Sequence, residues 1–300
     1  MYTMYLSATE TGVWEYELFL ALADFVRDMG IPLAVEPVET VQLKRWWGST
    51  RTIVLNHSLA FLQHHTTGRF HVLDCSDWVT PFEFDLRDVA RDPRCRVILK
   101  AQYQPEPYRK RPLTKVKPWT YFETHPSHVQ SNLEVYRCIP RDHELLFFRG
   151  NTTWEGRAAI LSQLSAAGVI DPDFEESVAY RDYLPKIARH RIALGLPGMG
   201  NLCHREIEAF GIGTPVLMPR LKNTTHRDLI PDYHYISVDV DTLTDEPGYV
   251  ADQIARRFHQ VAADQSYLDC VARAAMAWYE ANVRFPNSLA LTAQLLGLLS

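Results

Sequence analysis

Short runs of apolar and β-branched residues alternate along the chain with longer stretches whose apolar residues recur at helical spacing. In the N-terminal half, Leu18, Leu22 and Val26 follow the period of a helix over residues 14–29, and Gly30 ends that pattern. The short runs that predict strands lie at residues 2–7, 32–36, 52–56, 70–75 and 95–100. Short strands separated by helices or loops favour a parallel α/β sheet.

A second series of the same kind begins near residue 144. The pattern predicts strands at 144–149, 191–196, 214–218 and 234–238, and helices at about 153–167, 181–190 and 202–211. The tail from about 248 to 299 is predicted to be almost entirely helical. Two series of similar size predict two Rossmann-like domains that face each other across a cleft. We place these domains at residues 1–140 and 141–285, followed by a C-terminal helix at 286–300.

Composition and charge narrow the classes of protein. The chain has 300 residues, a net charge of −5 and 5 cysteines that form no C-x-x-C pair. Scattered cysteines favour free thiols in a reducing compartment, and an acidic total argues against nucleic acid as a partner. The start of the chain resembles no signal peptide, and no apolar run has the length of a membrane span. We therefore expect a cytoplasmic protein, and leave peripheral contact with a membrane open because residues 109–117 are locally basic.

The most informative segment runs from Arg191 to Pro219, where an apolar strand enters a small glycine-rich turn and then a helix. Glycine lets a backbone approach a ligand closely, and the N-terminus of the helix offers N–H groups and a positive dipole end. Such a turn suits a phosphate. The candidate phosphate-binding residues of the turn are Gly198, Met199, Gly200 and Asn201.

Two side chains of the helix that follows extend this candidate site. Arg205 lies in its first turns and can clamp a phosphate with two hydrogen bonds. Glu208, three residues further on, projects from roughly the same face and can accept hydrogen bonds from a ribose diol. The alternative interpretation is an ordinary strand-turn-helix unit with an Arg–Glu pair on its surface.

A second segment, Leu145 to Leu164, carries three further candidates. Its strand ends in Arg149 and Gly150, at the carboxyl edge where open α/β sheets bind ligands. Arg157 falls in the first turns of the next helix. The alternative interpretation is a capped helix with solvated arginines.

Taken together, the two segments resemble a known family. The sequences FFRGN (Phe147 onward) and LPGMGNLCHREIEAFGIGTPVL (Leu196 to Leu217) are similar to the donor-binding half of GT-B glycosyltransferases, above all the exostosin-type and protein O-glucosyltransferase (capsule-associated) families. The shared pattern is Arg205, then Glu208-Ala209, Gly213 and Pro215-Val216. The likeness covers about residues 144–285, and the N-terminal half matches no motif.

The resemblance implies a nucleoside-diphosphate sugar donor bound by residues 141–285, with the acceptor on the side of residues 1–140. Arg205 would contact the diphosphate and Glu208 the ribose or sugar, whereas Arg149 and Arg157 would serve phosphate or structure. The reaction implied is hexosyl or pentosyl transfer to a glycan, lipid-linked or protein hydroxyl, as in polysaccharide biosynthesis. The nucleotide sugar would be a co-substrate, and no further cofactor is expected.

Mechanistic expectations follow from the same resemblance. Related retaining enzymes carry two glutamates eight positions apart, and Gly200 stands where the first would be, so inversion is expected. GT-B enzymes usually stabilise the departing diphosphate with a helix N-terminus and cationic side chains, so we expect no metal. Asp239-Val240-Asp241, which has the spacing of a metal-binding D-x-D, is interpreted as a solvated loop.

An inverting transfer also needs a general base for the acceptor hydroxyl. We expect it at the carboxyl end of a strand in the N-terminal domain, with Asp77 as the first choice and Glu10 and His57 as the others. Each of the three can equally be a helix cap or a loop residue. Two other functions remain open: a GT-B-fold sugar-nucleotide epimerase, and a non-catalytic protein that binds nucleotide sugars.

Overall fold

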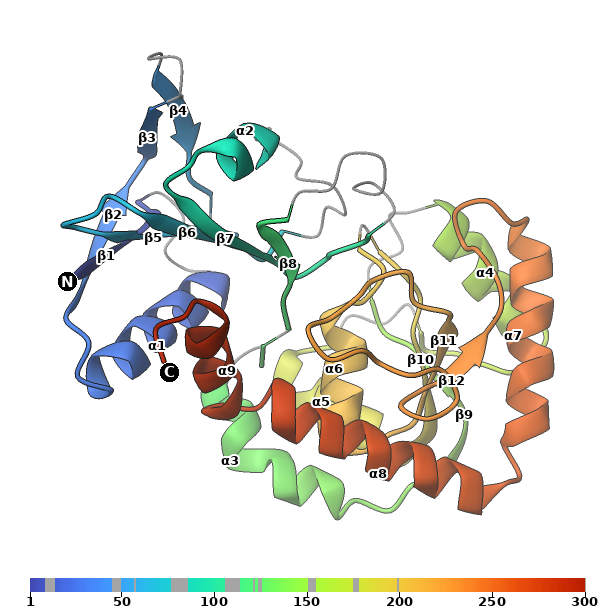
Figure 1. The fold of residues 1–300 in the computed structure, drawn as a ribbon. Coiled ribbons are helices and arrows are strands. Elements are labelled where there is room, and N and C mark those ends of the chain that lie inside the picture. Colours follow the sequence, from blue (N-terminus) through green and yellow to red (C-terminus); the bar gives the residue numbers. More distant parts are fainter. Residues whose placement is uncertain are drawn as a thin grey trace. The chain divides into compact units, whose positions relative to one another are not determined.

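The computed structural model of the chain forms two compact units (Figure 1). It describes residues 1–8, 14–44, 50–56, 58–76, 86–105, 114–120, 122–123, 126–150, 155–174, 178–198 and 200–299. The first unit consists of Met1–Phe122, Asn223–Arg227 and Phe285–Ser300, and the second of Glu123–Lys222 and Asp228–Arg284. The α/β class and the helical tail predicted from the sequence are confirmed.

The first unit contains a six-stranded sheet in the order β2-β1-β5-β6-β7-β8. Its strands are β1 (Tyr2–Ser7), β2 (Leu33–Val38), β5 (Leu59–His64), β6 (Phe70–Asp74), β7 (Cys95–Lys100) and β8 (Val116–Pro118). A separate antiparallel pair is formed by β3 (Thr40–Lys44) and β4 (Thr50–Val54). The helices are α1 (Trp14–Asp28), α2 (Leu86–Arg91) and α9 (Asn287–Leu295).

The sheet of the first unit is mixed rather than parallel. Strand β5, which the sequence pattern did not predict, pairs antiparallel with both β1 and β6. The reason is the connection between β5 and β6, because a five-residue turn closes a hairpin but is too short for the crossover that parallel neighbours need. The remaining neighbours in this sheet are parallel.

One face of this sheet packs against α1 and α9. Buried apolar residues of β1 and α1 share a core with Leu289 and Ala293 of α9. The indole N–H of Trp119 donates a hydrogen bond of 2.9 Å to the Thr292 hydroxyl, and both side chains are completely buried. The end of the chain is therefore part of the first unit, although α8 before it belongs to the second.

The second unit is built on a four-stranded parallel sheet in the order β12-β11-β10-β9. Its strands are β9 (His143–Phe147), β10 (His190–Leu194), β11 (Val216–Pro219) and β12 (Ile236–Val238), close to the four predicted positions. Its helices are α3 (Pro126–Arg137), α4 (Glu155–Ala166), α5 (Tyr180–Arg189), α6 (His204–Ile212), α7 (Pro247–Val261) and α8 (Gln265–Asn282).

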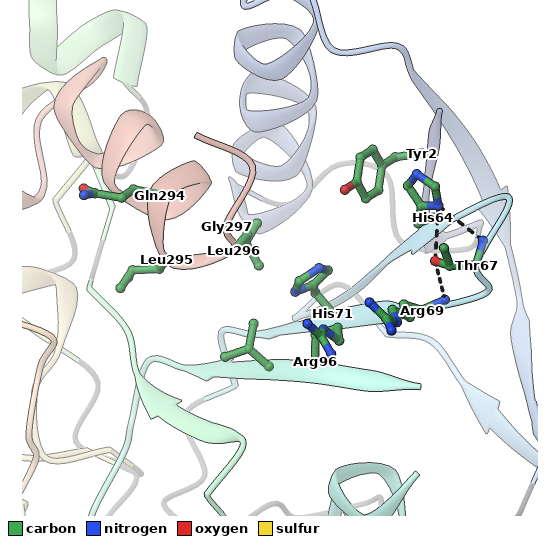
Figure 2. Close-up of a pocket in the computed structure, with 11 residues that line it drawn as sticks. Tyr2, His64, Thr67, Arg69, His71, Arg96, Gln294, Leu295, Leu296 and Gly297 are labelled. Atoms are coloured by element: carbon green, nitrogen blue, oxygen red, sulfur yellow. Dashed lines mark hydrogen bonds between the residues drawn. The ribbon is translucent and has the colours of Figure 1, made fainter. Parts of the chain in front are cut away.

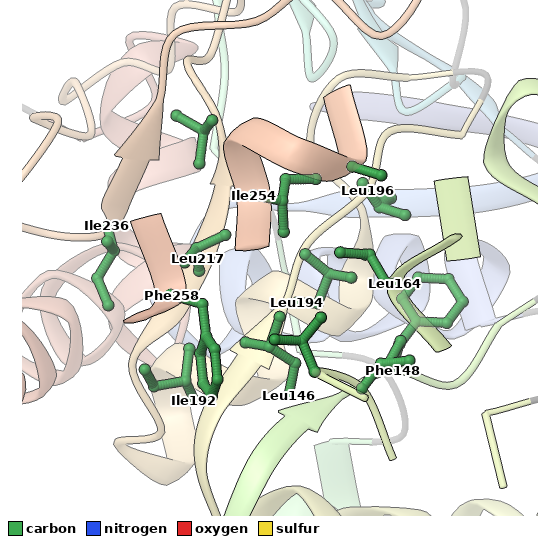
Figure 3. Close-up of a cluster of buried hydrophobic side chains, with 14 of the residues drawn as sticks. Leu146, Phe148, Leu164, Ile192, Leu194, Leu196, Leu217, Ile236, Ile254 and Phe258 are labelled. Atoms are coloured by element: carbon green, nitrogen blue, oxygen red, sulfur yellow. The ribbon is translucent and has the colours of Figure 1, made fainter. Parts of the chain in front are cut away.

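Helices cover both faces of this sheet, as its nearly continuous apolar strands require. Figure 3 shows the core on one face, where Leu146, Leu194 and Leu217 of the strands meet Leu164 of α4 and Ile254 of α7. Helices α5 and α6 lie on the other face and are backed by α3 and α8. Neither unit contains, in its described residues, a helix with both the length and the apolar character needed to cross a bilayer.

Candidate functional site

The two predicted donor-binding segments come together at the carboxyl edge of the second unit's sheet. Strand β9 runs on into Phe148 and Gly150, and its neighbour β10 runs on through Gly195 to Gly198. Helix α6 begins at His204, directly after the glycine-rich turn. Because parallel neighbours end at the same edge, this is where an open α/β sheet places a ligand.

The side chain of Arg205 is held at this edge by three neighbours. Its Cζ lies 4.2 Å from the centroid of the Phe148 ring, and its Nε donates a 2.6 Å hydrogen bond to the carbonyl oxygen of Arg149. Its Nη1 lies 3.3 Å from Oε1 of Glu206. A Cβ at Gly150 would collide with Nη2 of Arg205, so glycine is needed there to make room for the guanidinium.

Arg157 reaches the same place from α4. Its Nη2 donates to the carbonyl oxygen of Leu196 at 3.1 Å, and its Cζ lies 5.9 Å from the Phe148 centroid. A Cβ at Gly198 would come within 2.9 Å of that Nη2. Burial, and next the charge of Arg205, lower the pKa of Arg157 from its ordinary value. Two guanidiniums that repel each other thus lie near the same aromatic ring. An anion stabilises such an arrangement.

The glycine-rich turn itself uses some of the amides that we expected to bind phosphate. The N–H of Gly198 donates to the carbonyl oxygen of Gly200 at 3.1 Å. The N–H of Cys203 donates to Oε2 of Glu206 at 2.6 Å, as part of a capping box at the start of α6. Met199 lies outside the described residues, Gly200 is buried and Asn201 is half-buried. The side chains of this edge, more than its amides, are arranged for an anion.

Glu206 is the residue of this site that the sequence analysis missed. Its side chain is 3% exposed, caps α6 and neutralises part of the charge of Arg205. Burial raises the pKa of Glu206, although Arg205 and the Cys203 N–H act in the opposite direction. The available signal was the spacing of Cys203 and Glu206, which is that of a capping box with cysteine in place of serine or threonine.

Arg149 has a different environment from the other two arginines. Its Cζ lies 5.3 Å from the Phe147 centroid, and its Nη2 lies 3.5 Å from Oδ2 of Asp171. The same carboxylate lies 3.3 Å from Nε2 of His190. The pKa of Asp171 is lowered, because the Asp173 N–H, Arg149 and His190 together outweigh the raising effect of burial. The side chain of Arg149 is therefore in an internal ion pair. The contribution of Arg149 to the site is its carbonyl oxygen, which accepts the hydrogen bond from Arg205.

Glu208 lies on the side of α6 that faces α5. Its Oε1 accepts a 3.0 Å hydrogen bond from the hydroxyl of Tyr180. The side chain is half-buried. A role for Glu208 in binding ribose stays a prediction.

The three candidate bases, Glu10, His57 and Asp77, lie outside the described residues. Next to Asp77, however, the structure shows a buried polar cluster at the ends of β6 and β7. Oδ1 of Asp74 accepts hydrogen bonds from the Ser76 N–H at 2.9 Å and hydroxyl at 2.6 Å, and from Nζ of Lys100 at 3.1 Å. Lys100 is completely buried. This cluster fixes the chain immediately before Asp77.

The D-x-D sequence near the end of β12 is engaged by the protein itself. Oδ2 of Asp241 lies 2.5 Å from Nζ of Lys222, and the pKa of Asp241 is lowered chiefly by that contact. Asp239 is exposed and lies 3.8 Å from Arg220. In the part of the chain that the structure describes, no three His, Cys, Asp or Glu side chains gather closely enough to hold a metal ion.

Comparison with known proteins shows distant similarity to solved glycosyltransferase structures. HepE from Anabaena, solved in complex with UDP and glucose, has a TM-score of 0.46 and 12% identity over 76% of this chain and 71% of its own. A glycosyltransferase from Rickettsia africae has a TM-score of 0.45 and 10% identity over 70% of this chain and 67% of its own. Sucrose-phosphate synthase from Thermosynechococcus elongatus has a TM-score of 0.43 and 13% identity over 67% of this chain and 58% of its own.

No known family profile and no curated protein sequence matches the chain.

Proposed function

We propose that this protein is a GT-B-type glycosyltransferase that moves a sugar from a nucleoside-diphosphate donor to the hydroxyl of a glycan, lipid-linked or protein acceptor. The observation that carries the proposal is the pair of guanidiniums, Arg157 and Arg205, gathered on the Phe148 ring at the carboxyl edge of a parallel sheet. Glycines at 150 and 198 provide the space for both. The family resemblance of the same two segments supports this assignment.

The chemistry needs positive charge where the diphosphate leaves. The acceptor oxygen attacks the anomeric carbon and loses its proton to a base, and the bond from that carbon to the diphosphate breaks with its electron pair on the phosphate oxygen. Prearranged cations stabilise that developing charge without having to reorganise. Arg157, Arg205 and the positive end of α6 supply it in this proposal, without a metal.

The remaining parts of the proposal come from the first unit. Asp77, Glu10 or His57 would take the acceptor proton. A direct displacement by the acceptor inverts the anomeric centre, which agrees with the glycine at position 200.

Thermal unfolding with a panel of nucleoside diphosphates and their sugars tests donor binding. A ligand at 100 times its Kd adds about 2.7 kcal/mol of stability, which corresponds to a rise in Tm of about 5–10 °C for a unit of this size. Arg205→Lys keeps the charge but loses the planar fork, so we expect a weaker rise. Arg256→Ala is the matched control, because Arg256 is an exposed α7 arginine whose Nε pairs with Asp252 at 2.8 Å.

Sugar transfer is then followed by mass spectrometry with the donor so identified, with and without EDTA. We expect transfer that persists in EDTA and falls by about 10²-fold or more in Arg205→Ala. The proposal is wrong if no nucleoside diphosphate raises Tm, or if Arg205→Ala transfers sugar at the normal rate. Donor conversion without any acceptor would indicate an epimerase instead, and binding without turnover a non-catalytic protein.

A further inference from the structure

The first unit contains a pocket of about 500 Å³ that has no part in the proposed transfer (Figure 2). It opens at the amino ends of the parallel strands, beside Tyr2 of β1, His71 of β6 and Arg96 of β7. The end of α9 and the segment that follows it, through Leu296 and Gly297, form the opposite wall. Its volume is in the range of pockets that bind small molecules.

The charges that line this pocket are all positive or titratable to positive. Arg69 and Arg96 line it together with His64 and His71, and none of its lining residues that the structure describes is an aspartate or glutamate. Both arginines are exposed. Among the described residues, no carboxylate lies within ion-pair distance of either guanidinium, whereas neighbouring Arg94 is paired with Asp92 at 2.6 Å. Two uncompensated guanidiniums at one cavity favour an anion.

His71 adds a buried donor to this cavity. Its side chain stands on β6 and points toward the segment at Leu296 (Figure 2), and only 9% of the residue is exposed. Its Nδ1 is buried and has no hydrogen-bond partner among the described residues, although such atoms are nearly always satisfied in folded proteins. Burial, and next the charge of Arg96, lower the pKa of His71 to about 4. A neutral imidazole with its proton on Nδ1 would donate a hydrogen bond from that nitrogen to a ligand oxygen.

A second imidazole and several apolar side chains complete the lining. Nδ1 of His64 lies 3.3 Å from the backbone N–H of Thr67 and accepts from it, so a neutral His64 carries its proton on Nε2. The ring of Tyr2 packs edge-on against His64 at a centroid distance of 4.8 Å. Tyr2, Val97 and Leu295 give the cavity apolar walls beside its cations.

We propose that this pocket binds a small molecule that carries a phosphomonoester, of about the size of a hexose phosphate. The two guanidiniums and the His71 imidazole would hold the phosphate oxygens, and the apolar walls would contact the rest of the ligand. A lipid phosphate headgroup has the same anionic chemistry. The pocket lies within the first unit, whereas Arg157 and Arg205 belong to the second, so this site does not depend on the proposed sugar transfer.

Calorimetric titration of the full chain with glucose 6-phosphate, inorganic phosphate and glucose tests the site. We expect saturable binding of glucose 6-phosphate, weaker binding of phosphate and none of glucose. Arg69→Ala and Arg96→Ala should each weaken binding by about tenfold, the effect of losing one charge-assisted contact. Arg91→Ala, which removes an exposed arginine of α2 in the same unit outside the pocket, should leave it unchanged.

The histidine is tested separately by nitrogen-15 spectra of the labelled imidazoles, in which glucose 6-phosphate should shift the His71 signals. His71→Phe should bind more weakly than His71→Gln, which retains an N–H donor, and unfolding curves establish that each variant is folded. Vesicles containing phosphatidic acid test whether the phosphate belongs to a lipid headgroup. If only they bind, with the same dependence on Arg69 and Arg96, the ligand is a lipid headgroup with the proposed chemistry. The proposal is overturned if neither glucose 6-phosphate nor the vesicles bind, or if Arg91→Ala weakens binding as much as Arg69→Ala does.

Discussion

Removing the charge of Arg205 should destabilise the second unit through the carboxylate that it leaves behind. Glu206 is 3% exposed and Arg205 10%, with 3.3 Å between Oε1 and Nη1. In Arg205→Met, Glu206 would keep the Cys203 N–H but lose its cation. Breaking such a buried pair from one side costs about 3–5 kcal/mol, and the lost contact with the Phe148 ring adds about 0.5–1 kcal/mol.

A second substitution separates this effect from the loss of side-chain packing. In the double variant Arg205→Met with Glu206→Gln, neither member of the pair is charged and the amide oxygen can still cap α6. We expect it to recover most of the loss and to lie within about 1–2 kcal/mol of the natural chain, as found when buried pairs are replaced as a whole. The double variant should nevertheless fail to bind a nucleoside diphosphate.

Thermal unfolding measures both variants, and hydrogen exchange of the amides in residues 190–212 reports the second unit alone. At about 2–4 °C per kcal/mol, Arg205→Met should lower Tm by about 7–24 °C. A loss below about 1 kcal/mol in Arg205→Met would show that Glu206 does not need its cation. A double variant no more stable than Arg205→Met would show that packing, and not charge, accounts for the loss.

Three further predictions concern stability. In thermal unfolding, Gly213→Ala should lower the free energy of unfolding by about 1 kcal/mol or more beyond the loss in Gly168→Ala. Both glycines have positive φ, but only a Cβ at position 213 would meet a neighbouring side chain, at 2.6 Å. Thr292→Val should lower the stability of the first unit by about 1–3 kcal/mol, since the buried indole N–H of Trp119 then lacks its acceptor; an unchanged Tm would contradict the contact. Because burial lowers the pKa of His71 to about 4 from 6.5, the folded state resists protonation, and stability should fall by up to about 3 kcal/mol between pH 6.5 and 4. His71→Phe should flatten that part of the pH profile, and an unaltered profile would contradict the lowered pKa.

The sequence predicted the second unit more accurately than the first. Strands β9 to β12 are nearly continuous apolar runs with helices between them, and this pattern has one good solution, a parallel sheet covered on both faces. In the first unit, the turn at residues 65–69 reverses the chain, so that β5 runs antiparallel. Apolar periodicity identifies strands but contains no information on their direction, and only the length of a connection limits it.

Association of the end of the chain with the first unit was likewise beyond the reach of local pattern. Residues 287–295 form a helix as expected. What attaches that helix to the first unit is a core shared with β1 and α1 and the contact between Trp119 and Thr292, partners 173 positions apart in the sequence. Local periodicity shows which face of a helix is apolar, and does not show which sheet covers that face.

At the candidate site, the structure gives some of the predicted residues contacts that their sequence pattern did not indicate. From the sequence, Gly198 was expected to let the backbone approach a phosphate closely. In the structure, Gly198, like Gly150, leaves space for a guanidinium. A glycine in the sequence indicates that a larger side chain would collide at that position. It does not show whether the neighbouring group is a ligand or another side chain of the protein. The same limit explains why the sequence left Arg149, like Arg157, open between a phosphate and a structural role. Its partner Asp171 is far enough along the chain that no spacing rule connects them.

This difference in roles affects what the site can recognise. Backbone amides bind any suitably placed oxygen, whereas guanidiniums fixed against a ring and a carbonyl present their donors in a fixed plane and match the paired oxygens of a phosphate group. Contacts within the protein fix Arg205 in this way, with Phe148 on one side and the Arg149 carbonyl on another. Its ordering has therefore already been achieved on folding, so binding of a diphosphate need not order that side chain again. The arrangement favours a leaving group whose charge grows during the reaction over a neutral ligand of the same shape, as the proposed transfer requires.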